Sequence, residues 1–110
     1  MKYKLFSGSA KNLINVCYEQ YKPETNRIVI YNDSPRTIKS AEITLKNNTN
    51  NYFLYRVDRL EKKSGSLIDF GLQVDSNGIK FSGNLAEVSV KCSAGSFKFS
   101  PLEEKFFKLL

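Results

Sequence analysis

The chain has 110 residues, of which 41% are hydrophobic and 13% aromatic, which is enough apolar surface for one folded domain and excludes intrinsic disorder. Its 17 Lys and Arg outnumber its 11 Asp and Glu and give a formal net charge of +6, which favours association with polyanions such as nucleic acids or with anionic membranes. The sequence contains no His, so it lacks the usual general base of enzymes and the commonest zinc ligand.

The N-terminal residues MKYKLFSGSAKNL contain lysines but no apolar run long enough for a signal peptide or a membrane-spanning helix. We therefore expect no membrane span. If a signal peptide has been removed from the chain, an extracytoplasmic or secreted location is slightly favoured, and otherwise we expect the protein in the cytoplasm.

Residues 9–21, SAKNLINVCYEQY, fit two different periodicities. A strand would place Ile14, Val16 and Tyr18 on one face. A helix would instead align Ala10, Leu13, Cys17 and Tyr21. The β-branched Ile14 and Val16 favour the strand.

The rest of the chain is dominated by short runs in which apolar and polar residues alternate, a pattern typical of strands with one face on a core. The apolar members of these runs are Ile28 and Ile30; Ala41, Ile43 and Leu45; Phe53, Tyr55 and Val57; Ile68, Phe70, Leu72 and Val74; Ile79 and Phe81; and Ala86, Val88, Val90 and Cys92. Turn-forming residues separate the runs at 32–35, 46–51, 64–66, 75–78, 82–84 and 93–95. The pattern predicts an all-β fold, a single antiparallel β-sandwich of about seven strands over residues 13–100, in one domain that spans residues 1–110.

The stretch EVSVKCSAGSFKF, residues 87–99, predicts a hairpin with its turn at residues 93–95. Val88, Val90 and Cys92 share one face of the first strand, and Phe97 and Phe99 share one face of the second. We expect both faces to point into the core, where a free Cys92 would act as a small hydrophobic side chain.

The C-terminal residues 101–110 predict a short helix. Ser100 and Glu103 have the spacing of a capping box, with Pro101 at the first helical position. The helix is too short to be stable alone, so it either covers an end of the sandwich or meets a partner or a second copy of the chain. The apolar residues that would make that contact are Phe106, Phe107, Leu109 and Leu110.

Few residues suggest catalytic chemistry. The six glycines are scattered singly, so no phosphate-binding loop is formed, and two widely spaced cysteines cannot build a structural zinc site without His. The adjacent Glu103 and Glu104 are explained by the dipole of the predicted helix. We therefore expect a protein that is not an enzyme and that holds no metal or cofactor.

The segment RIVIYNDSPRTIKSAEITL, residues 27–45, resembles the immunoglobulin-like and fibronectin type III-like sandwiches, in which a strand ends in an Asn-Ser type turn and an alternating strand follows. The resemblance covers about residues 13–100 and implies a binding or scaffolding role. In immunoglobulin domains a cysteine on an early strand bonds one on the penultimate strand, and Cys17 and Cys92 are similarly placed. The resemblance therefore implies a disulfide between them, with packing of free thiols as the alternative.

A candidate binding surface follows from the basic residues and the polar tract KNNTNN, residues 46–51, because loops often carry binding in sandwiches. Tyr52 and Arg56 share one strand face, an arrangement that could stack bases and hold phosphates. The residues assigned to this surface are Asn48, Asn50, Tyr52, Arg56, Arg59, Lys62 and Lys63.

Three functions fit these features. The preferred one is a non-enzymatic module that binds another protein or takes part in an assembly. The alternatives are a small basic intracellular protein, such as a phage-encoded modulator of a host complex, and a nucleic-acid-binding domain. Self-association into a homo-oligomer is compatible with all three.

Overall fold

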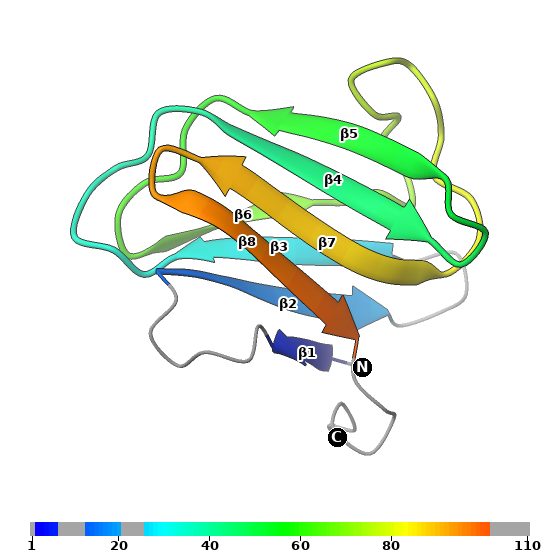
Figure 1. Cartoon of the computed structure of the whole chain (residues 1–110), viewed down its shortest axis with the longest axis horizontal. Helices are drawn as coiled ribbons and strands as arrows, with labels where there is room; N and C mark the ends of the chain where they lie inside the picture. Colours follow the sequence, from blue (N-terminus) through cyan, green and yellow to red (C-terminus); the bar gives the residue numbers. More distant parts are fainter. Residues whose placement is uncertain (1, 7–12, 21–25, 102–110) are drawn as a thin grey trace.

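The structure is a computed structural model that describes residues 2–6, 13–20 and 26–101. These residues form eight β-strands and no helix (Figure 1). The strands are β1 (Lys2–Phe6), β2 (Ile14–Gln20), β3 (Asn26–Asn32), β4 (Ala41–Asn47), β5 (Tyr52–Val57), β6 (Ser64–Ile68), β7 (Leu85–Cys92) and β8 (Gly95–Pro101). Neighbouring strands are antiparallel throughout the order β5-β4-β7-β8-β1-β2-β3-β6. The prediction of an all-β, antiparallel fold is confirmed.

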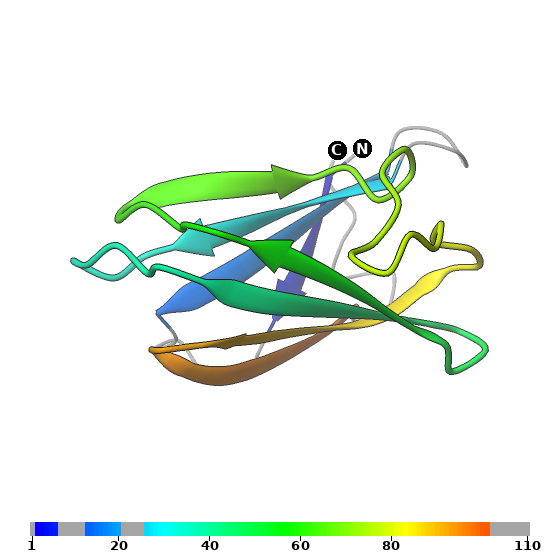
Figure 2. The same ribbon diagram turned by 90° about the horizontal axis from the view of Figure 1, so that it is seen from above.

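The strands lie in two layers, which Figure 2 shows from the side. One layer holds β2, β3 and β6, and the other holds β5, β4, β7 and β8. Strand β1 pairs with β2 along four residues and with the end of β8 at two, so it joins the layers on one side. On the other side β5 and β6 are the two ends of the strand order.

The core lies between the two layers and follows from the alternation in the sequence. In β4 the burial pattern alternates strictly, so Ala41, Ile43 and Leu45 are buried while Glu42 is exposed. Buried apolar side chains come from both layers, and each of the larger ones, such as Val, Leu, Ile or Phe, contributes about 1.5–3 kcal/mol when fully buried. The core residues are Ile14, Val16, Ile28, Ile30, Ile38, Ala41, Ile43, Leu45, Phe53, Tyr55, Leu60, Ile68, Phe70, Phe81, Leu85, Val88, Val90 and Phe99.

Most of the predicted strands are correct, including the strand alternative for the segment 9–21, of which residues 14–20 form β2. The hairpin of residues 87–99 is also confirmed, because Cys92 pairs with Gly95 around a turn at Ser93 and Ala94. The prediction missed β1, since the sandwich was expected to begin at residue 13.

The strand predicted over residues 68–74 is wrong. Strand β6 ends at Ile68, and the chain then turns, because the carbonyl of Asp69 accepts hydrogen bonds from the amides of Leu72 and Gln73 at 3.1 and 2.8 Å. Leu72 is consequently exposed rather than buried. Residues 69–84 form a long connection between the layers, which contains the predicted turn at 75–78 and one isolated bridge between Val74 and Lys80. The strand predicted at Ile79 and Phe81 is therefore also wrong.

The turn predicted at residues 64–66 is also wrong, because these residues begin β6 and pair with β3. Gly65 allows this close pairing. A Cβ atom at residue 65 would lie 2.7 Å from Cγ1 of Val29, which is closer than two carbon atoms can approach without a shift. The glycine that suggested a turn instead makes room for a neighbouring side chain.

The helix predicted over residues 101–110 lies outside the described residues, apart from its first position. Pro101 is the last residue of β8 and is paired with Leu5, so it does not begin a helix. Phe106, Phe107, Leu109 and Leu110 lie outside the described part of the chain.

Two buried asparagines hold the loops that connect the strands. Asn32, at the end of β3, donates from Nδ2 to the carbonyls of Arg36 and Leu60 at 2.8 and 2.9 Å and accepts from the amide of Ser34 at 3.0 Å. It thereby joins the 33–40 loop to the 58–63 loop, which also meet in a bridge between Ile38 and Leu60.

Asn47, at the end of β4, does the same at the opposite end of the molecule. Its Nδ2 donates to the carbonyl of Ser82 at 2.9 Å, and its Oδ1 accepts from the amides of Thr49 and Asn51, each at 2.9 Å. Because buried polar groups are costly when unpaired, these two side chains fix the shapes of four connections.

Replacement of Asn32 by Ala removes three hydrogen bonds and leaves their backbone partners buried without them. We expect Asn32→Ala to lower the free energy of unfolding by about 2–3 kcal/mol, measured by urea denaturation. The matched control is Asn77→Ala, at an exposed turn position, which is expected to change stability by less than about 0.5 kcal/mol. Equal stabilities of the two variants would contradict the role of Asn32.

Candidate functional site

The connections gather at two ends of the molecule, as expected when strands of two layers run antiparallel. The loops 33–40 and 58–63 and the turn of the β7–β8 hairpin lie at one end, on the left of Figure 1. The loops 47–51 and 69–84 lie at the other end, on the right. Surface loops on a rigid scaffold are the usual place for binding residues.

The 69–84 loop is fastened to the exposed edge of β5 by Asp75. The Asp75 carboxylate accepts hydrogen bonds from the amides of Ile79 and Asn77 within the loop, at 2.8 and 2.9 Å, and from the amide of Leu54 in β5, at 3.1 Å. Next to it, the amide of Ser76 donates to the carbonyl of Leu54 at 2.6 Å. The loop therefore occupies the edge of β5 as a further strand would.

The environment of Asp75 shifts two pKa values. Burial raises the pKa of the Asp75 carboxyl, but the hydrogen bonds from the amides of Ile79, Leu54 and Asn77 lower it more, so the pKa lies below its ordinary value. Burial, helped by the negative charge of Asp75, raises the pKa of Tyr55 to about 12. Asp75 is therefore a permanent charge that acts structurally at neutral pH.

The same loop presents apolar side chains to solvent. Leu72 is 74% exposed, Val74 53% and Ile79 52%, and Tyr52 at the start of the adjoining β5 is 63% exposed. We call these four residues the apolar loop surface. The sequence pattern assigned Leu72 and Val74 to the core, so it missed them as surface residues. They lie four and six residues after the end of β6, and nothing in the sequence marks that end.

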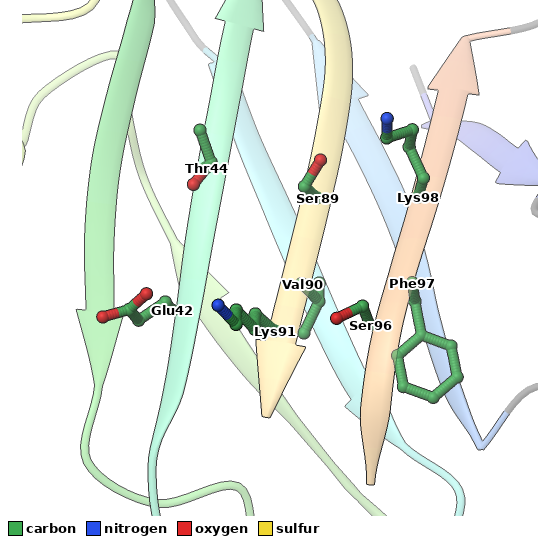
Figure 3. Close-up of a pocket in the computed structure, with 8 residues that line it drawn as sticks. All are labelled: Glu42, Thr44, Ser89, Val90, Lys91, Ser96, Phe97 and Lys98. Carbon is green, nitrogen blue, oxygen red and sulfur yellow. The ribbon is translucent and has the colours of Figure 1, made fainter. Parts of the chain in front are cut away.

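The outer face of the β5-β4-β7-β8 layer is polar and arranged in rows across the strands. One row holds Arg56, Glu42, Lys91 and Ser96, and the next holds Leu54, Thr44, Ser89 and Lys98. Figure 3 shows the β4, β7 and β8 members of both rows around a shallow hollow of about 290 Å³. This face has no His, and its carboxylates face cations.

The structure separates the residues that the sequence assigned to one binding surface. Asn48, Asn50 and Tyr52 lie at the end that contains the 47–51 loop. The 58–63 loop, which contains Arg59, Lys62 and Lys63, lies at the opposite end. Arg56 lies on the outer face of β5, in the row of Glu42. Asn48 is also part of the framework, because its Oδ1 accepts a hydrogen bond from the amide of Asn84 at 3.0 Å.

Three of the assigned cations have a carboxylate neighbour. Arg56 lies 3.6 Å from Glu42, Arg59 lies 2.9 Å from Glu61, and Lys63 lies 3.3 Å from Asp33. Exposed pairs of this kind contribute little to stability. They do place a negative charge beside each cation, which weakens the attraction of these residues for phosphate.

Cys17 and Cys92 are free thiols in the structure, so the disulfide that the family resemblance implied is not formed. Ile14 and Val16 point from β2 into the core, which places Cys17 on the outer face of that layer. Cys92 packs against the core from the other layer. The two thiols therefore lie on different sides of the β2 layer.

Within the described residues, no group of three or more Cys, Asp and Glu is positioned to hold a metal ion. Nor does the described part of the chain contain a helix able to cross a membrane. Comparison of the chain with family models, with curated protein sequences and with solved structures finds no match. Arguments about function therefore depend on the surfaces described above.

The lowered pKa of Asp75 predicts how the free energy of unfolding depends on pH in the acid range. A carboxyl whose pKa is lower in the folded than in the unfolded chain stabilises the fold above its unfolded pKa, and this contribution is lost as the pH falls through the folded pKa. We expect Asp75→Asn to lower the free energy of unfolding at pH 7 by about 1–3 kcal/mol. The Asn side chain places an NH₂ donor where the carboxylate oxygen accepted from the Leu54 amide, so this amide loses its acceptor.

The difference between Asp75→Asn and the wild type should shrink below about pH 4, measured by urea denaturation at several pH values. Asp58→Asn, at an exposed position directly after β5, is the control and should follow the wild type at every pH. A constant difference between Asp75→Asn and the wild type from pH 7 to pH 3 would contradict this account.

Proposed function

We propose that the protein is a non-enzymatic, protein-binding module with an immunoglobulin-like sandwich fold. The strand order supports the fold. In immunoglobulin domains strands A, B and E are neighbours in one sheet, and strands G, F and C, with C′ in the variable type, are neighbours in the other. Strands β2 to β8 follow the same chain order and give the neighbours β2-β3-β6 and β8-β7-β4-β5, with β1 added between β2 and β8.

The observation that carries the binding role is the apolar loop surface. Leu72, Val74 and Ile79 are more than half exposed on a loop whose backbone is fixed by Asp75. Binding sites in protein interfaces typically contain a few exposed apolar or aromatic anchors on a preorganised frame, because little conformational entropy is then lost on association. The exposed Tyr52 beside the loop is an anchor of the same type.

The other functions have less support. For nucleic-acid binding, Tyr52 and Arg56 were expected to act together, but Arg56 lies beside Glu42 and is separated from Tyr52 by the half-buried Leu54. An intracellular modulator of a host complex would use the same protein-binding surface and differ only in its partner. Self-association through Phe106, Phe107, Leu109 and Leu110 stays a hypothesis about residues outside the described ranges.

The proposal is tested by removing the anchors without disturbing the fold. In the double variant Leu72→Ser and Ile79→Ser both side chains are already exposed, so the free energy of unfolding should change by less than about 1 kcal/mol. The partner captured by chemical cross-linking in extracts of the source cells, and identified by mass spectrometry, should bind this variant at least about tenfold more weakly in a purified assay.

Tyr31→Ser on β3 is the control, since this apolar ring is also exposed but lies outside the 69–84 loop and lines neither the hollow next to Val74 nor the hollows beside the 33–40 loop. The control should bind the purified partner like the wild type. Equal affinity of the loop variant and the wild type would contradict a role of the apolar loop surface in binding.

A further inference from the structure

A series of neighbouring hollows extends from the outer face of β4, β7 and β8 to the 33–40 loop. The hollow of Figure 3 shares Glu42 and Lys91 with a second hollow of about 470 Å³. The second shares Lys39 and Ser93 with a third, of about 630 Å³, beneath the 33–40 loop. The three hollows adjoin one another through these shared residues, and we call them together the cationic groove.

Four cations of the described ranges line the cationic groove: Arg36, Lys39, Lys91 and Lys98. All four are exposed, and none forms an ion pair with another residue of the described ranges. Among the residues that the structure describes, Glu42 is the only carboxylate that lines the three hollows, and Arg56 lies 3.6 Å from it on the neighbouring strand. The groove therefore has an uncompensated positive charge, unlike the sites around Arg59 and Lys63.

Hydroxyl groups lie between these cations. Thr44 and Ser89 share a row with Lys98, and Ser96 lies opposite Lys91 on the adjoining strand. Figure 3 shows these side chains lining one hollow. Hydroxyls can both donate and accept hydrogen bonds, so they suit the carboxylates and the backbone groups of an extended peptide. The ammonium groups beside them suit carboxylates.

We propose that the cationic groove binds an extended, acidic segment of a partner protein. An extended chain rises about 3.3 Å per residue, so about ten residues would equal the longest dimension of the molecule, 35 Å. A segment of that length can reach all four cations. The binding site is separate from the apolar loop surface, which lies at the β5 edge.

The groove is less suited to nucleic acid. Sequence-tolerant binding of single strands uses exposed aromatic rings on which bases stack. Of the described residues that line the three hollows, only Phe97 is aromatic, and it packs against the core. Glu42 between Lys91 and Arg56 would also repel a phosphate, whereas a peptide can place an amide N–H beside it.

The experiment measures fluorescence anisotropy of a labelled peptide of about ten residues in which Glu alternates with Thr, a composition that favours an extended chain. We expect the wild-type protein to bind it at low salt and to release it as the ionic strength rises. Lys39→Glu with Lys91→Glu should weaken binding by about tenfold or more, since each change replaces an attraction by a repulsion.

The control is Lys62→Glu with Lys80→Glu, which changes the net charge equally at two exposed lysines outside the groove. It should retain binding within about threefold, as long-range attraction alone is screened beyond about 10 Å. Equal weakening by the two double variants would overturn the proposal, because the attraction would then come from net charge alone.

A labelled single-stranded oligonucleotide of equal charge is measured in parallel. Tighter binding of the oligonucleotide, lost with the groove variant, would overturn the proposal in favour of a nucleic-acid site. The variant Leu72→Ser with Ile79→Ser should bind the acidic peptide like the wild type. This measurement separates the groove from the proposed function, because either surface can fail its test without the other.

Discussion

The structure depends on three buried polar side chains that satisfy the backbone of its loops. A two-layer fold leaves many amide and carbonyl groups unpaired wherever the chain leaves a sheet, and each is costly if it is buried without a partner. Asn32, Asn47 and Asp75 meet these groups with three or more hydrogen bonds each. Each of the three side chains joins two chain segments, so together they fix the loops at both ends of the molecule.

This fixed framework is what makes the exposed side chains useful for binding. Leu72, Val74 and Ile79 on a flexible loop would collapse onto the surface or lose entropy on association. Because the loop backbone is held by Asp75, these side chains remain exposed in one arrangement. The same reasoning applies to Arg36 and Lys39, whose loop is held by Asn32 and by its bridge to Leu60.

The alternation of apolar residues predicted the fold class and most strands, because burial of one face decides where those residues lie. It failed for residues 68–74, where the alternation is equally regular but the partner strand β3 is already paired with residues 64–68. The local alternation of apolar and polar residues carries no information about which strand pairs with which. The binding surfaces were harder to predict than the strands, because Glu42 beside Arg56 and Asp33 beside Lys63 come from distant segments of the chain. The expected disulfide failed for a similar reason, since Cys17 shares no face with Cys92.

The edge of β5 shows how one structural need shapes the candidate binding surface. An exposed edge strand offers unpaired backbone groups to other chains and is a hazard for aggregation. The 69–84 loop removes this hazard, since Asp75 and Ser76 occupy the amide and carbonyl of Leu54, and the Ser76 hydroxyl accepts from the amide of Arg56 at 3.2 Å. An additional strand paired with β5 would have covered the edge as well, but its side chains would have alternated between the core and solvent. The irregular loop instead buries Phe70 and Phe81 at its two ends and leaves its middle apolar residues exposed, so it closes the edge to backbone pairing while opening it to recognition through side chains.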